Sequence, residues 1–309
     1  MAEDQYKEMI NDIDNPVADQ IKANGLGKAS MSRFNNDTLD ADIHLGWISV
    51  DLTALPSMGR FYPADADLKI RSAKVAEIRH FSTIDETNLI DIEEKLNSIV
   101  KACTRFKSGT KMMSYKDILE EDRIYVLLAI RDLSFPEAEN KLMLEAQDSS
   151  GNEFKVELSS KYFDVEKISE QIQPYYSEEA RSFVIQTKSA GEVTMCPPSI
   201  GVMEEITKFM QGRQTERKTW DQSFLQILPY ITLDWRGFNA KKIFENEIEF
   251  QSWSEKKYMV IYRLAEQMKI GIKPELVVEH EGEEVFVPLN FPGGIKSLFI
   301  ISDLTSELL

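Results

Sequence analysis

The chain of 309 residues is strongly acidic, with 36 Lys and Arg against 52 Asp and Glu and a formal net charge of −16. Phosphate backbones and anionic bilayers repel such a protein, so we expect no nucleic acid and no membrane among its partners. The hydrophobic fraction of 42% supports buried cores, and no apolar run approaches the ~20 residues of a membrane helix. Cys103 and Cys196 lie far apart and form no disulfide framework, and the first residues are polar, which predicts a soluble protein of a reducing cytoplasm.

The first segment, residues 1–44, is polar and only weakly periodic. Turn signals such as Asn15-Pro16 and Asn35-Asn36 interrupt it. We interpret it as a flexible arm that becomes ordered on a partner, and a disordered leader is the alternative.

The next segment combines short strands with a fixed turn. Residues 47–52 and 68–80 have the pattern of strands, and Pro56 and Gly59 between them indicate a tight turn. An aromatic pair anchors this turn. We predict that it contacts a partner through Leu55, Pro56, Gly59, Phe61 and Tyr62.

Two amphipathic helices follow. Thr83-Ile84-Asp85-Glu86 has the form of a capping box, and apolar residues from Leu89 to Phe106 alternate at spacings of three and four. A second helix is expected over about residues 114–133, before Pro136. Joined by the connection 106–113, the two helices predict an antiparallel helical hairpin. We expect its seam to pack within the subunit, and pairing with another subunit is the alternative.

The rest of the chain alternates hairpins and helices. Strands at 141–146 and 153–158 flank Asp148-Ser149-Ser150-Gly151-Asn152, and strands at 275–280 and 285–289 flank Glu281-Gly282-Glu283, which predicts two hairpins of one design. Further strands are expected at 182–187 and 193–195, and helices at 200–210, 223–233, 240–250 and 252–271. This mixed order indicates an α+β fold. We divide it into the arm 1–44, an α+β domain 45–198 with the first hairpin, and a helical region 199–309 that ends in the second hairpin.

A search for catalytic or metal chemistry finds no assembled site. His44, His80 and His280 have no Cys or His at ligand spacing, and no P-loop, nucleophile elbow or dinucleotide-binding fingerprint occurs. We interpret the run Glu120-Glu121-Asp122 as solvated surface charge, because adjacent helix positions point about 100° apart. Carboxylates that are remote in sequence and meet in the fold stay open. We predict no enzyme, no cofactor and no metal.

Three motifs occur in a fixed order along the chain. The first is Leu55-Pro56-Ser57-Met58-Gly59-Arg60-Phe61-Tyr62, similar to a Leu-Pro-Ser-x-Gly-x-x-Tyr opening. The second runs from Asp122 to Arg131 and resembles an Asp-x-x-Tyr-x-Leu helix that ends in Arg. The third, Gly271-Ile272-Lys273-Pro274-Glu275, resembles a glycine-started lead into a terminal ribbon. Together the motifs resemble the baseplate hub proteins of T-even-type contractile-tailed bacteriophages, in patches from residue 55 to residue 299.

The resemblance implies two hairpins built like zinc ribbons, because related proteins often carry Cys pairs there. Here the first hairpin has Glu145-Ala146-Gln147-Asp148 and the second has Glu279-His280-Glu281-Gly282. Without thiolates a structural zinc cannot contribute to folding. We therefore expect degenerate, metal-free ribbons held by cross-strand packing, and stoichiometric zinc in the purified protein would contradict this.

The resemblance also implies a function. It predicts a structural, non-enzymatic viral late protein of the baseplate hub, present in multiple copies, that acts by protein–protein contacts in virion assembly. Its partners would be tail tube, tape-measure or wedge subunits, first in the host cytoplasm and then in the tail baseplate of the virion. The alternatives are a transient assembly chaperone absent from the mature virion and a tail-associated hydrolase that uses remote carboxylates.

Overall fold

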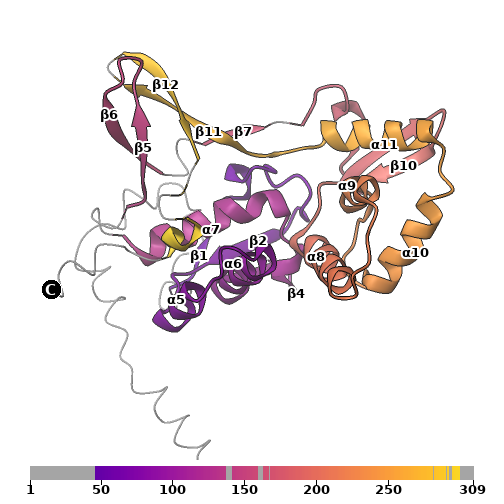
Figure 1. The fold of residues 1–309 in the computed structure, drawn as a ribbon, viewed down its shortest axis with the longest axis horizontal. Helices are drawn as coiled ribbons and strands as arrows, with labels where there is room; N and C mark the ends of the chain where they lie inside the picture. Colours follow the sequence, from indigo (N-terminus) through magenta and orange to yellow (C-terminus); the bar gives the residue numbers. More distant parts are fainter. Residues whose placement is uncertain are drawn as a thin grey trace, which may run out of the picture.

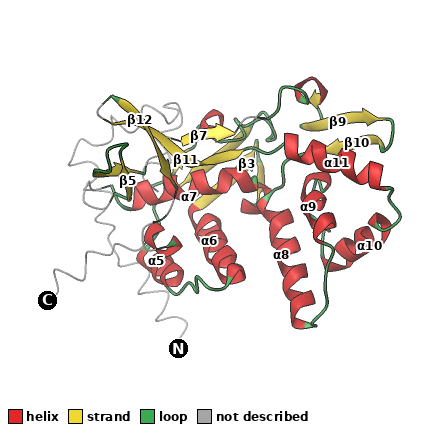
Figure 2. Ribbon diagram, turned by 45° about the horizontal axis from the view of Figure 1, so that its top comes forward, coloured by secondary structure: helices red, strands yellow, loops and turns green. Residues whose placement is uncertain are grey.

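The computed structural model describes residues 46–136, 141–158, 163–166, 168–280, 282–289, 291 and 294–299. The expected arm, residues 1–44, and His44 with it, lie outside this part of the chain. The described elements confirm the α+β class, because α-helices accompany several small antiparallel sheets (Figures 1 and 2). Within these ranges, none of the helices combines the length and hydrophobicity that crossing a bilayer requires.

A four-stranded antiparallel sheet begins the described chain. Its order is β1-β2-β3-β4, with bounds Ile48–Ser49, Ala66–Ile70, Thr104–Ser108 and Lys111–Met113. A short 3-10 helix at Leu52–Ala54 follows β1, so the strand predicted over 47–52 is shorter than expected. Leu68, Ile70 and Phe106 bury their side chains in the core beneath this sheet.

Two predictions between residues 68 and 89 are wrong, one on the type of an element and one on the start of a helix. The strand predicted over 68–80 ends at Ile70, and Val75–Ser82 forms helix α5, because the Glu77 side chain accepts from the backbone N–H of Lys74 and caps the first turn. Thr83 does not cap the next helix. Helix α6 spans Leu89–Cys103 and begins after Asn88, whose side chain accepts from the backbone N–H of Ile90.

The helical hairpin is present, with more structure between its helices than expected. Helix α7 spans Glu120–Ser134, and strands β3 and β4 and a 3-10 helix at Tyr115–Asp117 separate it from α6. Phe106, expected on the first helix, lies in β3. The apolar faces of both helices are buried in the main core, so their seam packs within the chain, as predicted. The buried residues of these two faces include Leu96, Ile99, Val100, Cys103, Val126, Leu127 and Ile130.

Four helices follow, and the first three of them build a second, smaller core. They are α8 (Ile200–Thr215), α9 (Gln222–Ile231), α10 (Ala240–Phe250) and α11 (Glu255–Gln267). Figure 1 shows them in orange at one end of the molecule. The smaller core contains Val202, Ile206, Phe209, Phe224, Leu228, Phe238 and Ile243. Helix α11 instead contributes Ile261 and Ala265 to the main core. Beside the four helices lies the three-stranded sheet of β8 (Tyr176–Ser177), β9 (Ser182–Thr187) and β10 (Gly191–Met195).

Both predicted hairpins form. The first consists of β5 (Met143–Gln147) and β6 (Glu153–Glu157), and the second of β11 (Gly271–His280) and β12 (Glu283–Pro288). Their likeness to zinc ribbons stays a prediction. Strand β7 (Phe163–Glu166) pairs with β11 and joins the second hairpin to the preceding chain, while a 3-10 helix at Ile295–Leu298 closes the described part. Strand β7, before residue 198, pairs with β11, after residue 199, and the main core contains residues from both sides of this boundary. The two predicted domains therefore share their packing.

Candidate functional site

The turn between β1 and β2 is held in a conformation that few residues adopt. Met58 and Gly59 have φ angles of 53° and 72°, both in the left-handed region. At Gly59 a Cβ atom would lie 3.1 Å from the Cβ of Leu52, so a side chain at this position would also require Leu52 to shift. The glycine of the first motif is thus explained by both backbone conformation and close packing.

A buried carboxylate connects this turn to the first turn of α7. Asp122 is fully buried and accepts three hydrogen bonds, from the Ser57 backbone N–H at 2.8 Å, the Ser57 Oγ at 2.6 Å and the Tyr62 hydroxyl at 2.6 Å. The Tyr62 oxygen in turn accepts from the Leu119 backbone N–H at 3.0 Å. Ser57, Tyr62 and Asp122 therefore form one closed hydrogen-bonded unit, which we call the Asp122 unit.

Burial dominates the electrostatics of the Asp122 unit. It raises the pKa of Asp122, while the donors from Ser57 and Tyr62 oppose that shift by stabilising the carboxylate. Burial also raises the pKa of Tyr62 well above its ordinary value, and the neighbouring Asp122 charge adds to the shift. Tyr62 consequently stays a neutral donor to the Asp122 carboxyl group.

The other side of the same turn contacts the sheet of β8–β10. Phe61 packs edge-on against Tyr176, with ring centroids 5.7 Å apart, and against Phe183 at 6.0 Å. The Arg60 guanidinium lies 4.4 Å from the centre of the Tyr176 ring and donates to Gln173. The Tyr176 hydroxyl donates to the carbonyl oxygen of Arg60. The turn thus joins α7 on one side to this sheet on the other.

These contacts bury most of the predicted partner-binding residues in the protein interior. Leu55, Pro56 and Tyr62 are buried, and Gly59 and Phe61 are half-buried. Only the tip of the turn, Met58, is exposed, at 49%. A partner that contacts this turn would therefore meet Met58 first, and the binding role of the other five stays a prediction. Ser57 and Asp122 were absent from the predicted site, although both belong to the quoted motifs.

The third motif reaches the same place. At Gly271, the first residue of β11, a Cβ atom would lie 3.0 Å from the Glu121 Oε2, and the φ angle is 144°. Glu121 precedes Asp122 in the first turn of α7. The start of α7 is therefore the point at which all three motifs meet, although they are separated by long stretches of sequence.

The acidic start of α7 is not the solvated surface that its sequence suggested. Besides Asp122, burial raises the pKa of Glu120 and of Glu121 to about 7. The charge of Glu120 raises the pKa of Glu121 further, and Arg123 opposes both shifts. Glu120 and Glu121 line a pocket of about 290 Å³ whose other walls are mainly apolar. That interpretation was wrong for this run because tertiary packing covers it.

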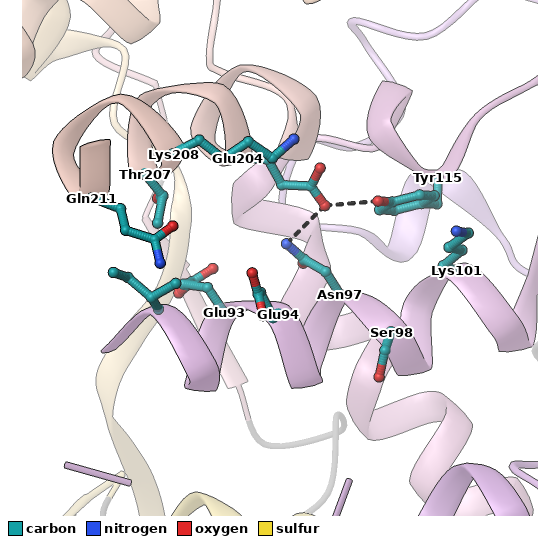
Figure 3. A pocket seen from close by; sticks show the side chains of 11 residues that line it. Glu93, Glu94, Asn97, Ser98, Lys101, Tyr115, Glu204, Thr207, Lys208 and Gln211 are labelled. Atoms are coloured by element: carbon teal, nitrogen blue, oxygen red, sulfur yellow. Dashed lines mark hydrogen bonds between the residues drawn. The ribbon is translucent and has the colours of Figure 1, made fainter. Parts of the chain in front are cut away.

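Arg123 is the centre of a second polar network. Its guanidinium pairs with Glu120 at 2.5 Å and with Glu93, and it donates to Asn97 at 2.9 Å. The Asn97 amide donates to the Glu204 carboxylate on α8, which also accepts from the Tyr115 hydroxyl at 2.7 Å. Figure 3 shows these two hydrogen bonds converging on Glu204. The network ties α6 and α7 to α8.

Glu204 lies at the edge of a polar pocket between α6 and α8. The pocket has a volume of about 230 Å³, and its walls carry both carboxylates and amines, among them Glu93, Glu94, Lys101 and Lys208. Lys116 pairs with Glu204 at 2.8 Å, so this carboxylate is compensated within the chain. The walls of this pocket therefore offer both donors and acceptors of hydrogen bonds to a polar ligand.

The two hairpins lie side by side and contact each other through their side chains. The Phe154 ring of β6 stacks on the His280 ring of β11, with centroids 3.8 Å apart and planes 2° from parallel. The Ser149 hydroxyl donates to Glu283 at 2.5 Å across the same junction. In the described residues no group of three or more His, Cys, Asp or Glu side chains could hold a metal ion. The residues at the knuckles therefore do not fit the zinc that the resemblance implies.

Comparisons with known proteins add no relative. No family model, no curated protein and no solved structure matches the chain. The three motifs and the contacts among them therefore provide the basis for assigning a function.

Proposed function

We propose that the protein is a structural, non-enzymatic component of the baseplate hub of a contractile phage tail, acting by protein–protein contacts in baseplate assembly. One observation carries the proposal. Asp122 of the second motif accepts hydrogen bonds from Ser57 and Tyr62 of the first, residues 65 and 60 positions away in the sequence.

This contact supports the resemblance because it gives the motif positions a common physical reason. Ser57, Gly59 and Tyr62 are the residues that the turn and the Asp122 unit require, and Gly271 of the third motif adjoins the same helix start. Motifs that matched by chance would have no reason to converge in space. Their convergence favours a shared architecture, and with it the function that the resemblance implies.

The contacts of the carboxylates favour a structural role over the hydrolase alternative. A glycosidase needs two carboxyl groups about 5–10 Å apart that face a substrate cleft. At the start of α7, Asp122 is fully buried with three donors, and Glu120 is paired with Arg123. Carboxylates engaged in this way stabilise the packing of helices. They are poorly placed to accept a proton from a ligand or to donate one to it.

Mass spectrometry of purified virions tests the proposal. If the phage that encodes the chain is purified and its tail proteins are quantified, we expect this protein at a fixed ratio to other baseplate subunits. Its presence in infected cells together with its absence from virions would contradict a structural role and favour the assembly-chaperone alternative. Hydrolysis of cell-wall glycan by the purified protein, abolished by Glu121→Gln, would instead favour the hydrolase.

The role of residues 1–44 needs its own experiment. The full chain and a chain that begins at residue 45 should be compared for binding to purified tail tube, tape-measure and wedge subunits. If the arm becomes ordered on a partner, the shorter chain binds more weakly. Equal binding by both chains would exclude the arm from the interface.

A further inference from the structure

The outward face of the β11–β12 hairpin carries apolar side chains that nothing in the described chain covers. On the inward face Leu276, Val285 and Val287 are buried, and Figure 1 shows β5 and β6 beside this hairpin at the end of the molecule opposite α10. Val277 and Phe286 point the other way and are exposed at 38% and 59%. They are direct cross-strand partners, so their side chains form one continuous apolar patch. A hairpin with one buried face normally has polar residues on the other.

Uncompensated carboxylates frame this patch. Glu279 and Glu284 are direct cross-strand partners next to the Val277–Phe286 pair, and Glu275 lies on its other side opposite Pro288. All three carboxylates are exposed, and within the described part of the chain none of them forms an ion pair. Like charges directly opposite each other destabilise a pair of strands. The hairpin therefore retains an unfavourable arrangement that a cation from outside would relieve.

The charge pattern decides among the possible occupants. Nucleic acids and anionic membranes are repelled by the same carboxylates. A second copy of this chain would bring Glu275, Glu279 and Glu284 against their own counterparts, so pairing of two identical faces is disfavoured as well. A protein surface that has an apolar pocket with Lys or Arg at its rim would cover the apolar patch and pair with the carboxylates around it.

We propose that the face formed by Glu275, Val277, Glu279, Glu284 and Phe286 docks onto a basic-rimmed apolar surface of another protein, with Phe286 as the anchor. The proposal rests on the proposed function, since it takes that protein to be another tail or baseplate subunit. Phe286 supplies most of the apolar contact, and the carboxylates set orientation and speed of association. Binding should weaken as salt concentration rises, because rim charges are screened.

Two double variants and two matched controls test this face. Val277→Ser/Phe286→Ser removes the apolar patch, and Glu279→Lys/Glu284→Lys reverses the charge of two carboxylates beside it. Met112→Ser changes an exposed apolar residue on β4, and Glu178→Lys/Glu179→Lys changes the net charge equally at an exposed site elsewhere. All substituted side chains are exposed, so circular dichroism and thermal melting should match those of the native chain. The probes are purified tail tube, tape-measure and wedge subunits of the same phage, measured by surface plasmon resonance at two salt concentrations.

We expect one probe to bind the native chain and both controls alike, and to bind each hairpin variant about tenfold or more weakly. Equal binding to all five chains would overturn the proposed face and leave the proposed function standing. Dimerisation of the native chain alone, lost in Val277→Ser/Phe286→Ser, would make a second copy the occupant and also overturn it. If no probe binds the native chain, both this proposal and the proposed function are rejected.

Discussion

At the scale of single residues, the start of α7 shows how packing changes the role of a charged side chain. Asp122 is surrounded by donors from a turn that is distant in the sequence, and Glu120 is paired with Arg123. Glu121 lies against Gly271, and the charge of Arg123 offsets only part of the rise in its pKa. These three neighbours therefore differ in their energetics, although their side chains are similar.

The Tyr62 hydroxyl should contribute measurably to stability. Tyr62→Phe removes a donor to Asp122 and leaves the Leu119 backbone N–H without its acceptor, both in a buried site. We expect the free energy of unfolding to fall by about 1–3 kcal/mol, as measured by urea denaturation. Tyr175→Phe is the matched control. Because Tyr175 is 47% exposed, this variant should be as stable as the native protein. Equal losses in the two variants would contradict a special role for Tyr62.

Glu121 should make stability depend on pH. Burial, with the charges of Glu120, Asp122 and Glu166, raises its pKa to about 7, above the ordinary value of 4.5. Between these values the folded protein holds a proton that the unfolded chain has lost, so the free energy of unfolding falls as pH rises through this window. Glu121→Gln removes that loss and should stabilise the protein at pH 8 by on the order of 1–3 kcal/mol.

The Glu121 prediction is checked by melting temperatures at pH 5 and pH 8. The difference between the two should be smaller in Glu121→Gln than in the native chain. Glu94→Gln makes the same chemical change at an exposed position on α6 and should keep the native difference. The prediction fails if both variants keep it.

At the scale of elements, helix α8 is positioned by a glycine that the sequence pattern does not single out. Gly201 lies in its first turn, where an added Cβ would be 2.5 Å from Trp235 Cγ and 2.9 Å from Lys116 Cβ. The Trp235 indole N–H donates to Asp117 at 2.8 Å, so this ring is fixed in place. The close approach lets α8 pack against the 3-10 helix that precedes α7.

Two substitutions in α8 should have opposite effects. Gly201→Ala should destabilise the protein by about 1–3 kcal/mol, because neither the tryptophan ring nor the backbone can move freely. Gly212→Ala, in the same helix but with nothing within 4 Å of the new Cβ, should stabilise it by up to about 1 kcal/mol through helix propensity. Thermal unfolding of both variants provides the measurement, and a gain in stability for Gly201→Ala would refute the packing argument.

At the scale of the whole molecule, the main core connects parts of the chain that the sequence divided. Strand β7 pairs with β11, and Ile261, Ala265 and Leu276 belong to the same core as the helical hairpin. The smaller core of α8–α10 adjoins this region through α8, which the Glu204 network links to α6. The predicted boundary at residue 198 therefore lies inside a shared packing unit.

We expect the chain to unfold in one cooperative transition. A fragment of residues 199–309 should fail to fold alone, because it loses β7, one of the two strands that pair with β11, and exposes the residues that it contributes to the main core. Differential scanning calorimetry of the full chain and near-ultraviolet circular dichroism of the fragment give the measurements. Two resolved transitions, or a fragment with fixed aromatic signals, would restore the division into independent domains.

The sequence by itself determined the α+β class, the helical hairpin and both β-hairpins. It also determined the helices expected at 240–250 and 252–271, of which the second is shorter, Glu255–Gln267, because periodicity and turn residues are local signals. It also supplied every motif residue of the Asp122 unit. Only the tertiary structure decided that Leu55 and Tyr62 are buried, that Glu120 and Glu121 carry raised pKa values, and that Phe154 meets His280. Burial and proximity depend on contacts between residues far apart in the chain, and a single sequence contains no local signal for them.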